Sequence, residues 1–494
     1  MVRSLKNSFL PISRIPPEVL SLIPDYCEEE YVDRVSITLT HVCRRWREAF
    51  ISRSTLWTHL DCMDVDKTRT YIQRSKSSPL RIFIFDTWGK RCPNHAFSLV
   101  IPHISRIRSL MILAGAIPDL LRHFRCHPPL LEELDINITL LPTLTIDNAM
   151  FGGDLSPLRR LTLIGVVTHL PWRNMANLTV FKLHCPLMYE VAVTRILDFF
   201  ESVPLLNTVD VTNSIPDSSD APPGRTVSLR HLKTLSIATG PVHSILSHLR
   251  IPIGASLRVW TTFGSQTSPL LSYLPETSFN ILSLSHIAAV DLCFHPEDKC
   301  VQLSGPSGSL RLFARWTNRR IPLSTMDHRI LRPLGPRVCS TTQRLVILKY
   351  INRSPADTEG CPIFHTLSSM NNLRTLVLSQ CYHRPFLFAL DPGKNSSKQV
   401  LCPDLKEIVF YTAPWGYAGS LIGMAKRRAV KGVKLLSIKM IGLGAPPMDA
   451  NVVKLREYVT QVEYRGDTAP LSWDCIPDES ESGFGEQFVV RTSI

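Results

Sequence analysis

A short apolar pattern recurs along most of the chain. An apolar residue is followed by two variable residues, a second apolar residue, one variable residue and a third apolar residue. The clear instances are Ile107/Leu110/Ile112, Leu131/Leu134/Ile136, Leu158/Leu161/Leu163, Leu178/Phe181/Leu183, Leu206/Val209/Val211, Leu232/Leu235/Ile237, Leu373/Leu376/Leu378, Leu405/Ile408/Phe410 and Leu435/Ile438/Met440, with weaker ones at Leu257/Trp260 and Ile287/Val290/Leu292. Because alternate residues of a strand face the same side of a sheet, each instance predicts a short strand with one buried face.

The spacing of these instances predicts how the strands are organised. Most gaps are about 20 to 32 residues, near the period of leucine-rich repeats. We therefore predict an α/β protein (α+β overall) in which an irregular leucine-rich-repeat-like solenoid follows a small all-α segment. Some returns between strands look helical, since residues 193–200 place Ile196, Leu197 and Phe200 on one face. The alternative is an α/β domain of conventional topology whose strand starts resemble one another.

Two features refine this prediction. Only the instance at Leu373 is followed by a cysteine, Cys381, of the kind that satisfies the turn after a repeat strand. Turn-forming residues at 213–226, an Arg/Pro-rich interval without a clear repeat at 317–342, and the intervals 353–361 and 391–398 predict surface loops.

Helical patterns precede the strands. Pro17 suits the first position of a helix and Glu18 its first turn, while Val19, Leu20 and Ile23 share one side before Pro24 ends the helix. In residues 37–50, the positions of Val42, Trp46, Ala49 and Phe50 predict a single apolar stripe. Helices within about 40 residues bury too little apolar surface to fold alone. We therefore expect a partner, which is either the rest of this chain or another protein.

Composition places the chain among ordinary globular proteins. It has 494 residues, 44% of them hydrophobic and 20% charged, with a formal net charge of +13. That length allows two to four domains or one long repeat array. The N-terminus lacks the apolar run of a signal peptide, and we find no long uncharged apolar stretch. We expect a soluble protein of the cytoplasm, the nucleus or both, without membrane attachment.

Candidate chemistry of the chain's own is sparse. The thirteen cysteines include no C-x-x-C pair, and the pairs Cys92/His95 and His295/Cys300 fall short of the four ligands of a structural zinc site. No nucleophile-elbow, P-loop or dinucleotide-binding motif is present. We predict no catalytic residue, no metal and no cofactor. Basic residues cluster at 311–320 and 426–434 without regular interleaved aromatics, which favours a solvated basic face over nucleic-acid binding.

The N-terminal segment carries two motif halves in order, Ile15-Pro16-Pro17-Glu18-Val19-Leu20 and Val42-Cys43-Arg44-Arg45-Trp46-Arg47. They are followed by Ser54-Thr55-Leu56-Trp57 and by a segment from Tyr71 to Leu80. This order resembles the F-box of large fungal F-box protein families. The resemblance covers about residues 11–85. It departs from the family pattern at Ile15, where leucine is commonest, at Pro24, and in the acidic run Glu28-Glu29-Glu30 that lengthens the connection.

The resemblance implies a substrate-recognition subunit of a Skp/cullin/F-box ubiquitin ligase, which binds a Skp-type adaptor, through it a cullin, and an unidentified protein substrate. Together, the resemblance and the residue patterns predict a lead-in at 1–11, the F-box at 12–53, a packed bridge at 54–78, the repeat region at 79–466 and a tail or cap at 467–494. The motif positions implied to contact the adaptor are Ile15, Pro16, Leu20, Ile23, Val42, Cys43 and Trp46. The alternative is an interaction scaffold, without ligase function, whose N-terminal helices cap its own core.

Overall fold

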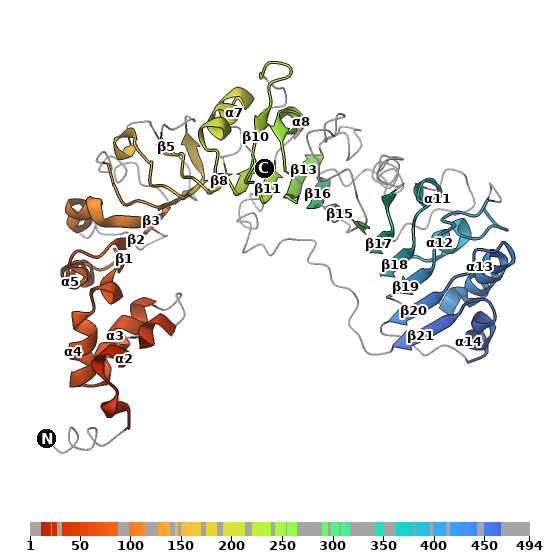
Figure 1. Ribbon diagram of the computed structural model, residues 1–494, viewed down its shortest axis with the longest axis horizontal. Helices are drawn as coiled ribbons and strands as arrows, with labels where there is room; N and C mark the ends of the chain where they lie inside the picture. The colour runs from red at the N-terminus through yellow and green to blue at the C-terminus, as the bar shows by residue number, and fades with distance from the viewer. Residues whose placement is uncertain are drawn as a thin grey trace, which may run out of the picture. The chain divides into compact units, whose positions relative to one another are not determined.

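The computed structural model divides into two compact units, which we call unit 1 (residues 1–221 with 229–231) and unit 2 (residues 222–228 with 232–494). Figure 1 shows their helices and strands. The structure describes residues 11–20, 22–26, 32–86, 98–114, 127–138, 144–146, 150–168, 174–184, 191–212, 220–238, 243–252, 254–263, 289–294, 298–305, 308–316, 341–348, 362–379, 381–395, 399–411, 415–441 and 449–465.

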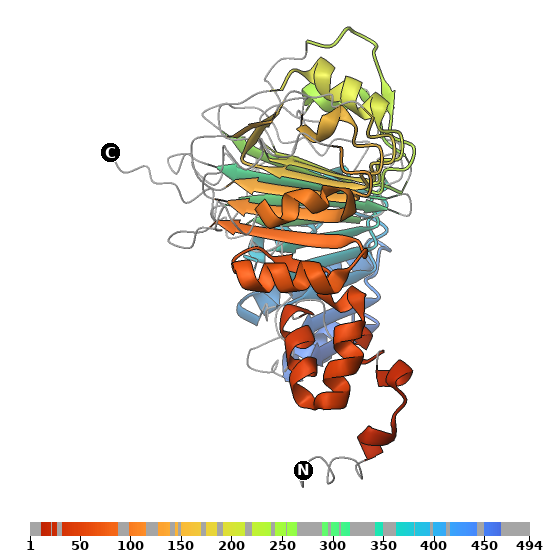
Figure 2. The ribbon, with the colours of Figure 1, turned by 90° about the vertical axis from the view of Figure 1, so that its left-hand side faces the viewer.

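Unit 1 begins with short helices, which face the viewer in Figure 2. They are η1 (Pro11–Arg14), α2 (Pro17–Leu20), η2 (Ile23–Tyr26), α3 (Val32–Val42), α4 (Arg44–Ser52), η4 (Ser54–Trp57) and, after the first strand, α5 (Val65–Ser75). The Asp64 side chain caps α5 by accepting hydrogen bonds from the amides of Asp66 and Lys67, at 2.8 and 3.0 Å. This cap satisfies amides that have no partner within the helix.

Seven of the described strands of unit 1 form one parallel sheet in chain order. They are β1 (His59–Asp61), β2 (Leu80–Asp86), β3 (Ile107–Ala114), β4 (Glu133–Ile138), β6 (Arg160–Ile164), β8 (Val180–His184) and β9 (Thr208–Thr212). The remaining elements are η5 (Ile101–Arg106), η7 (Met150–Gly153), α7 (Val193–Ser202) and the parallel pair β5 (Leu144–Ile146) and β7 (Val166–Thr168).

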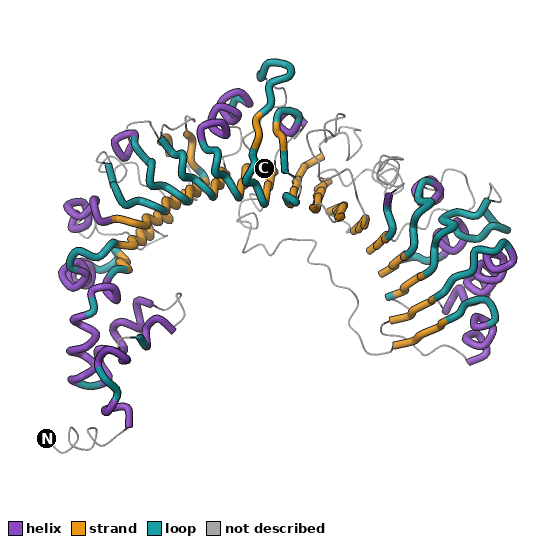
Figure 3. Tube along the Cα trace, viewed as in Figure 1, coloured by secondary structure: helices purple, strands orange, loops and turns teal. Residues whose placement is uncertain are grey.

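Alternate residues of each strand are apolar and form the core on one face of this sheet. Ile82, Leu110 and Leu134 face one another across three neighbouring strands and are each at most 1% exposed. Helix α7 packs on the same buried side, where the rings of Phe199 and Phe181 lie 4.5 Å apart. Figure 3 shows the helices and loops of this part of unit 1 on one side of its strands. Ile196, Leu197 and Phe200 are buried on α7, so the helix predicted there is confirmed.

Unit 2 also combines a sheet with helices. Its strands are β10 (Val227–Ser228), β11 (Thr234–Ala238), β12 (Leu249–Arg250), β13 (Ser256–Phe263), β14 (Ala289–Phe294), β15 (Asp298–Gly305), β16 (Gly308–Trp316), β17 (Arg344–Leu348), β18 (Thr375–Ser379), β19 (Glu407–Phe410), β20 (Ser437–Ile441) and β21 (Gln461–Arg465). Its helices are α8 (His243–Leu246), α11 (Pro362–Ser368), α12 (Arg384–Ala389), η12 (Trp415–Tyr417), α13 (Ala418–Val430) and α14 (Asp449–Arg456).

The strand order of unit 2 overturns the solenoid prediction. Strands β17 to β21 pair in parallel and in chain order, and β10 pairs separately with β12. Strands β14, β15 and β16, however, form an antiparallel meander in reversed spatial order, with β16 beside β13 and β14 beside β17. The protein is therefore a mixed α/β structure with large, mainly parallel sheet regions, and the predicted irregular solenoid is wrong. The apolar pattern located individual strands correctly but carried no information on their pairing order.

Two further predictions from the sequence can be compared with the structure of unit 2. The thiol of Cys381 donates to the carbonyl of Ser379 at the end of β18 and to that of Ile347 in the neighbouring strand β17, at 3.1 Å each, so this cysteine bonds to both strands. The surface loop predicted at residues 391–398 is confirmed only in part, because residues 391–395 form turns with Gly393 and Lys394 exposed, whereas Asp391 and Asn395 are only 1% and 3% exposed. Arg427 of α13 forms an ion pair with Asp391, and the Asn395 amide donates to the carbonyl of Ala389 at 3.1 Å.

Candidate partner-binding site

The first motif half forms a short helix that ends early. Pro17 opens α2 and Glu18 lies in its first turn, as predicted. The helix ends at Leu20, and residues 23–26 continue as the 3-10 helix η2. Pro24 lies inside η2, where a missing backbone amide cannot support a longer α-helix. Val19, Leu20 and Ile23 therefore do not share one continuous helix.

The second motif half is divided between two helices. Cys43 has an extended backbone, with φ −161° and ψ 171°, and separates α3 from α4. Val42 is consequently the last residue of α3, whereas Trp46 belongs to the first turns of α4. The single apolar stripe predicted over residues 37–50 is wrong. Instead, Val42 lies at a corner between two helices that pack against each other.

The motif residues implied to contact an adaptor differ widely in exposure. Pro16 is exposed, Val42 is 54% exposed, and Ile15, Ile23, Cys43 and Trp46 are half-buried. Leu20 has no exposed surface, since its side chain is already covered within the chain. A side chain without exposed surface can contact a partner only after its neighbours move. The prediction for Leu20 therefore stays untested, and Val42 offers the cleaner contact.

Apolar exposure is concentrated in this segment. Among the residues that the structure describes, six of twelve exposed large hydrophobic side chains fall between residues 12 and 42. These six are Ile12, Val19, Leu22, Tyr26, Ile37 and Val42. The motif comparison singled out only Val42 of these as a contact residue. Because contiguous exposed apolar surface marks interaction sites, these six side chains are the candidates for a surface that a partner covers.

Polar and aromatic contacts hold the helices in place. The Arg45 guanidinium donates to the carbonyl of Ile15 at 2.6 Å, which ties α4 to the start of the segment. Trp46 packs edge-on against the buried Phe50, with ring centroids 5.5 Å apart. The indole of Trp57 then donates to the carbonyl of Phe50 at 3.0 Å. Trp46 is thus partly internal, and its loss would disturb the packing of α4.

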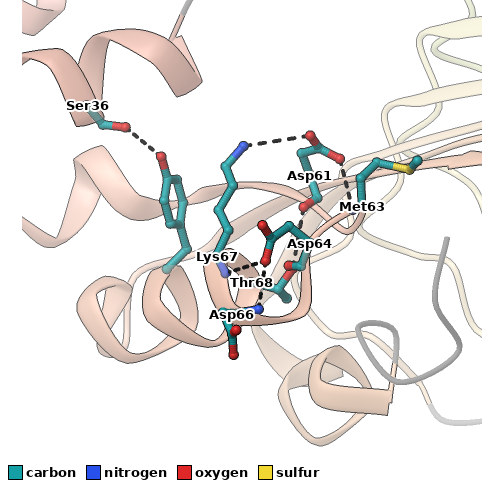
Figure 4. Close-up of polar contacts among 8 residues, drawn as sticks. Ser36, Asp61, Met63, Asp64, Asp66, Lys67 and Thr68 are labelled. Atoms are coloured by element: carbon teal, nitrogen blue, oxygen red, sulfur yellow. Dashed lines mark hydrogen bonds and ion pairs between the residues drawn. The ribbon is translucent and has the colours of Figure 1, made fainter. Parts of the chain in front are cut away.

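The helices are joined to the sheet of unit 1 through α5. Leu56, Trp57 and Leu60 are buried, and Trp57 stacks edge-on against Tyr71 of α5 at 5.0 Å. The Tyr71 hydroxyl and the Ser36 hydroxyl of α3 form a buried hydrogen bond of 2.8 Å. Figure 4 shows Ser36 directed at α5, together with the polar residues at the start of that helix. A packed joint therefore connects α3 with the first strands.

The described part of the chain contains neither a candidate metal site nor a candidate membrane span. No group of three or more His, Cys, Asp or Glu residues there could hold a metal ion. Cys92, His95 and His295 lie outside the described residues. No described helix has the length and apolar content needed to cross a membrane.

The basic cluster at residues 426–434 proves to be partly structural. Arg428 is completely buried, and its guanidinium donates to the carbonyls of Leu401 and Cys402 at 2.8 Å each. Arg427 is paired with Asp391, whereas Lys426 is exposed. The solvated basic face expected from the sequence is therefore wrong for Arg428.

Comparisons with known proteins assign no family. No family model matches the chain, and no curated protein matches it. Among solved structures, the chain is similar to the protein of a structure titled "Crystal structure of TLR13-ssRNA13 complex", with 13% identity and a TM-score of 0.33. The match covers 78% of this chain and 45% of that one, so this chain spans less than half the length of its neighbour. At that TM-score, the likeness supports no conclusion about this protein.

Proposed function

We propose that this protein is a substrate-recognition subunit of a Skp/cullin/F-box-type ubiquitin ligase. In this role, residues 12–53 bind the Skp-type adaptor and the sheet-bearing remainder binds a protein substrate. The ordered motif halves support the proposal, and Val42, a motif position that is 54% exposed at the corner between α3 and α4, carries it. The subunit needs no catalytic side chain, because it raises the effective concentration of a substrate lysine near the ubiquitin carrier.

An interaction scaffold with a self-capping N-terminal segment is the second candidate. Leu20 is fully buried and α3 contacts η4 and β1, which favours helices that cover their own chain. Under this function the exposed apolar side chains of the segment need no adaptor. The two candidate functions therefore differ in whether Val42 contacts an adaptor.

Substitution of Val42 separates them. We expect Val42→Asp to reduce capture of the purified Skp-type adaptor by the full chain at least tenfold, because a carboxylate at a buried contact must lose its water shell. Val453→Asp is the matched control, since Val453 is a 60% exposed valine on helix α14 of unit 2. The control should capture adaptor like the wild type, and both variants should retain the wild-type thermal midpoint.

Two outcomes contradict the proposal. Capture by Val42→Asp equal to that of the wild type would remove the α3–α4 corner from the interface. A folded wild-type chain that captures no adaptor would favour the scaffold.

A further inference from the structure

The sheet of unit 1 has a second face that its described helices do not cover. Helix α7 packs on the side of Phe181, where Ile82, Leu110 and Leu134 are buried. Their sequence neighbours point to the opposite side, because strand side chains alternate. Two rows cross β2, β3 and β4 there in register, Phe83–Met111–Asp135 and Phe85–Leu113–Asn137.

Each row changes from apolar to polar at the same strand. Phe83, Phe85 and Leu113 are half-buried and Met111 is 36% exposed, which leaves an apolar strip along β2 and β3 that is partly open. On β4, Asp135 and Asn137 present oxygen acceptors directly beside this strip. The Oδ1 atom of Asn137 accepts no hydrogen bond from any residue that the structure describes. An acceptor left in this way costs stability until a donor reaches it.

The charge of Asp135 is only partly compensated. Burial raises the pKa of its carboxyl group to about 6, although Lys182 and Arg160 oppose the shift. Both cations lie on the side of β6 and β8, away from the apolar strip. Other charged or ionisable groups of this face are Arg81, Glu133, Asp210 and His184, together with His59 and Asp61 of β1, which lie in register with Arg81 and Phe83. Asp210 pairs with His184 at 3.4 Å, Asp61 pairs with Lys67 at 3.7 Å, and the His59 ring stacks on that of Phe83 with centroids 6.5 Å apart. The acidic and basic groups of this face nearly balance in number, so its net charge selects no ligand. Selectivity would therefore come from direct contacts with individual groups.

We propose that the strip formed by Phe83, Phe85, Met111 and Leu113, together with Asp135 and Asn137, binds an arginine or lysine side chain in an extended segment of another protein. The aliphatic stem of such a side chain would lie on the apolar strip, and its cationic head would donate to the two acceptors of β4. Arginine suits the site best, because its planar guanidinium can also stack on a phenylalanine ring.

This site would select protein segments that contain an arginine or lysine. That such segments belong to ubiquitination substrates rests on the proposed function. Peptide binding itself does not depend on the adaptor. We therefore expect Asp135 variants to capture adaptor like the wild type and Val42→Asp to bind peptide like the wild type. The two proposals can then fail separately.

The test measures fluorescence anisotropy of a labelled peptide with a Leu-Arg-Leu core against the full chain, with the citrulline peptide as the uncharged equivalent. We expect the wild type to bind the arginine peptide at least tenfold more tightly than the citrulline peptide. Asp135→Asn should abolish that difference, and Met111→Ser should weaken both peptides several-fold. Asp404→Asn, at an exposed carboxylate of unit 2, is the matched control and should change nothing.

The pH dependence supplies an independent measurement. A proton on Asp135 competes with the cation, so affinity for the arginine peptide should fall as the pH drops below about 6 in the wild type. The loss should be smaller in Asp135→Asn, and this difference would assign the pH dependence to Asp135. The proposal is overturned if the wild type binds both peptides equally, binds neither at millimolar concentration, or is unaffected by Asp135→Asn.

Discussion

At the scale of single residues, a buried histidine makes the stability of the folded protein depend on pH. His383 is 5% exposed and lies edge-on against Phe410, with ring centroids 5.1 Å apart. Burial lowers the pKa of its imidazole from 6.5 to about 4. The folded state therefore contains neutral His383 at a pH where the unfolded chain already binds a proton.

This shift predicts a loss of stability in mild acid. Between pH 6.5 and about 4 the unfolded state holds more protons at this site, so the free energy of unfolding falls as the pH falls, by up to about 1.4 kcal/mol per unit. From pH 7 to 5 the wild type should lose roughly 2 kcal/mol more than His383→Phe, as measured by urea denaturation. His365→Phe, at an exposed histidine of α11, should keep the wild-type pH dependence. Equal losses in wild type and His383→Phe would refute this assignment.

At the scale of elements, the joint between α3 and α5 decides whether the N-terminal helices act with the sheet of unit 1. A buried hydrogen bond joins Ser36 and Tyr71, next to the edge-on contact of Tyr71 with Trp57. The guanidinium of Arg74 lies over the other side of that joint, 4.3 Å from the Trp57 ring. These contacts couple helices that are distant in sequence.

A double-mutant cycle measures the coupling. Ser36→Ala and Tyr71→Phe should each lower the free energy of unfolding by about 1 kcal/mol, and the double variant should cost little more than either, since both remove one hydrogen bond. Ser202→Ala breaks an unrelated contact at the end of α7, a 2.7 Å bond to the Phe199 carbonyl, and should combine additively with Tyr71→Phe. Additive costs for Ser36→Ala and Tyr71→Phe would mean that the hydroxyls do not interact.

At the scale of the whole molecule, the two compact units predict separate responses to core damage. Leu376 is fully buried in β18, in register with Leu345 and Ile408 of the neighbouring strands. Leu376→Ala removes buried methyl groups and should cost about 2 to 5 kcal/mol. Hydrogen exchange should then accelerate in β17–β20 and stay unchanged in β3–β8.

Leu163→Ala supplies the mirror-image experiment. Leu163 is fully buried in β6 of unit 1, so exchange should accelerate in β3–β8 and stay unchanged in β17–β20. Uniform acceleration across both units, in either variant, would show that the chain opens as one cooperative structure.

The sequence by itself located most strands and their buried faces. The apolar pattern placed Leu161 and Leu163 on β6, and Leu376 and Leu378 on β18, and all four are buried. This works because a period of two reports directly which side of a strand faces the core. Pro24 correctly predicted that the first helix would be short, but the helix ends at Leu20 and Ile23 belongs to η2, so the predicted helical face of Val19, Leu20 and Ile23 was wrong.

Only the tertiary structure decided the pairing of β14–β16, the corner at Cys43 and the exposure of each motif residue. The same apolar pattern fits a strand paired in chain order and one inserted in reversed order, because the partner strand lies outside the local sequence. Leu20 and Val42 are both apolar motif positions, yet one is fully buried and the other is 54% exposed. Their difference depends on contacts between helices, which local periodicity does not encode.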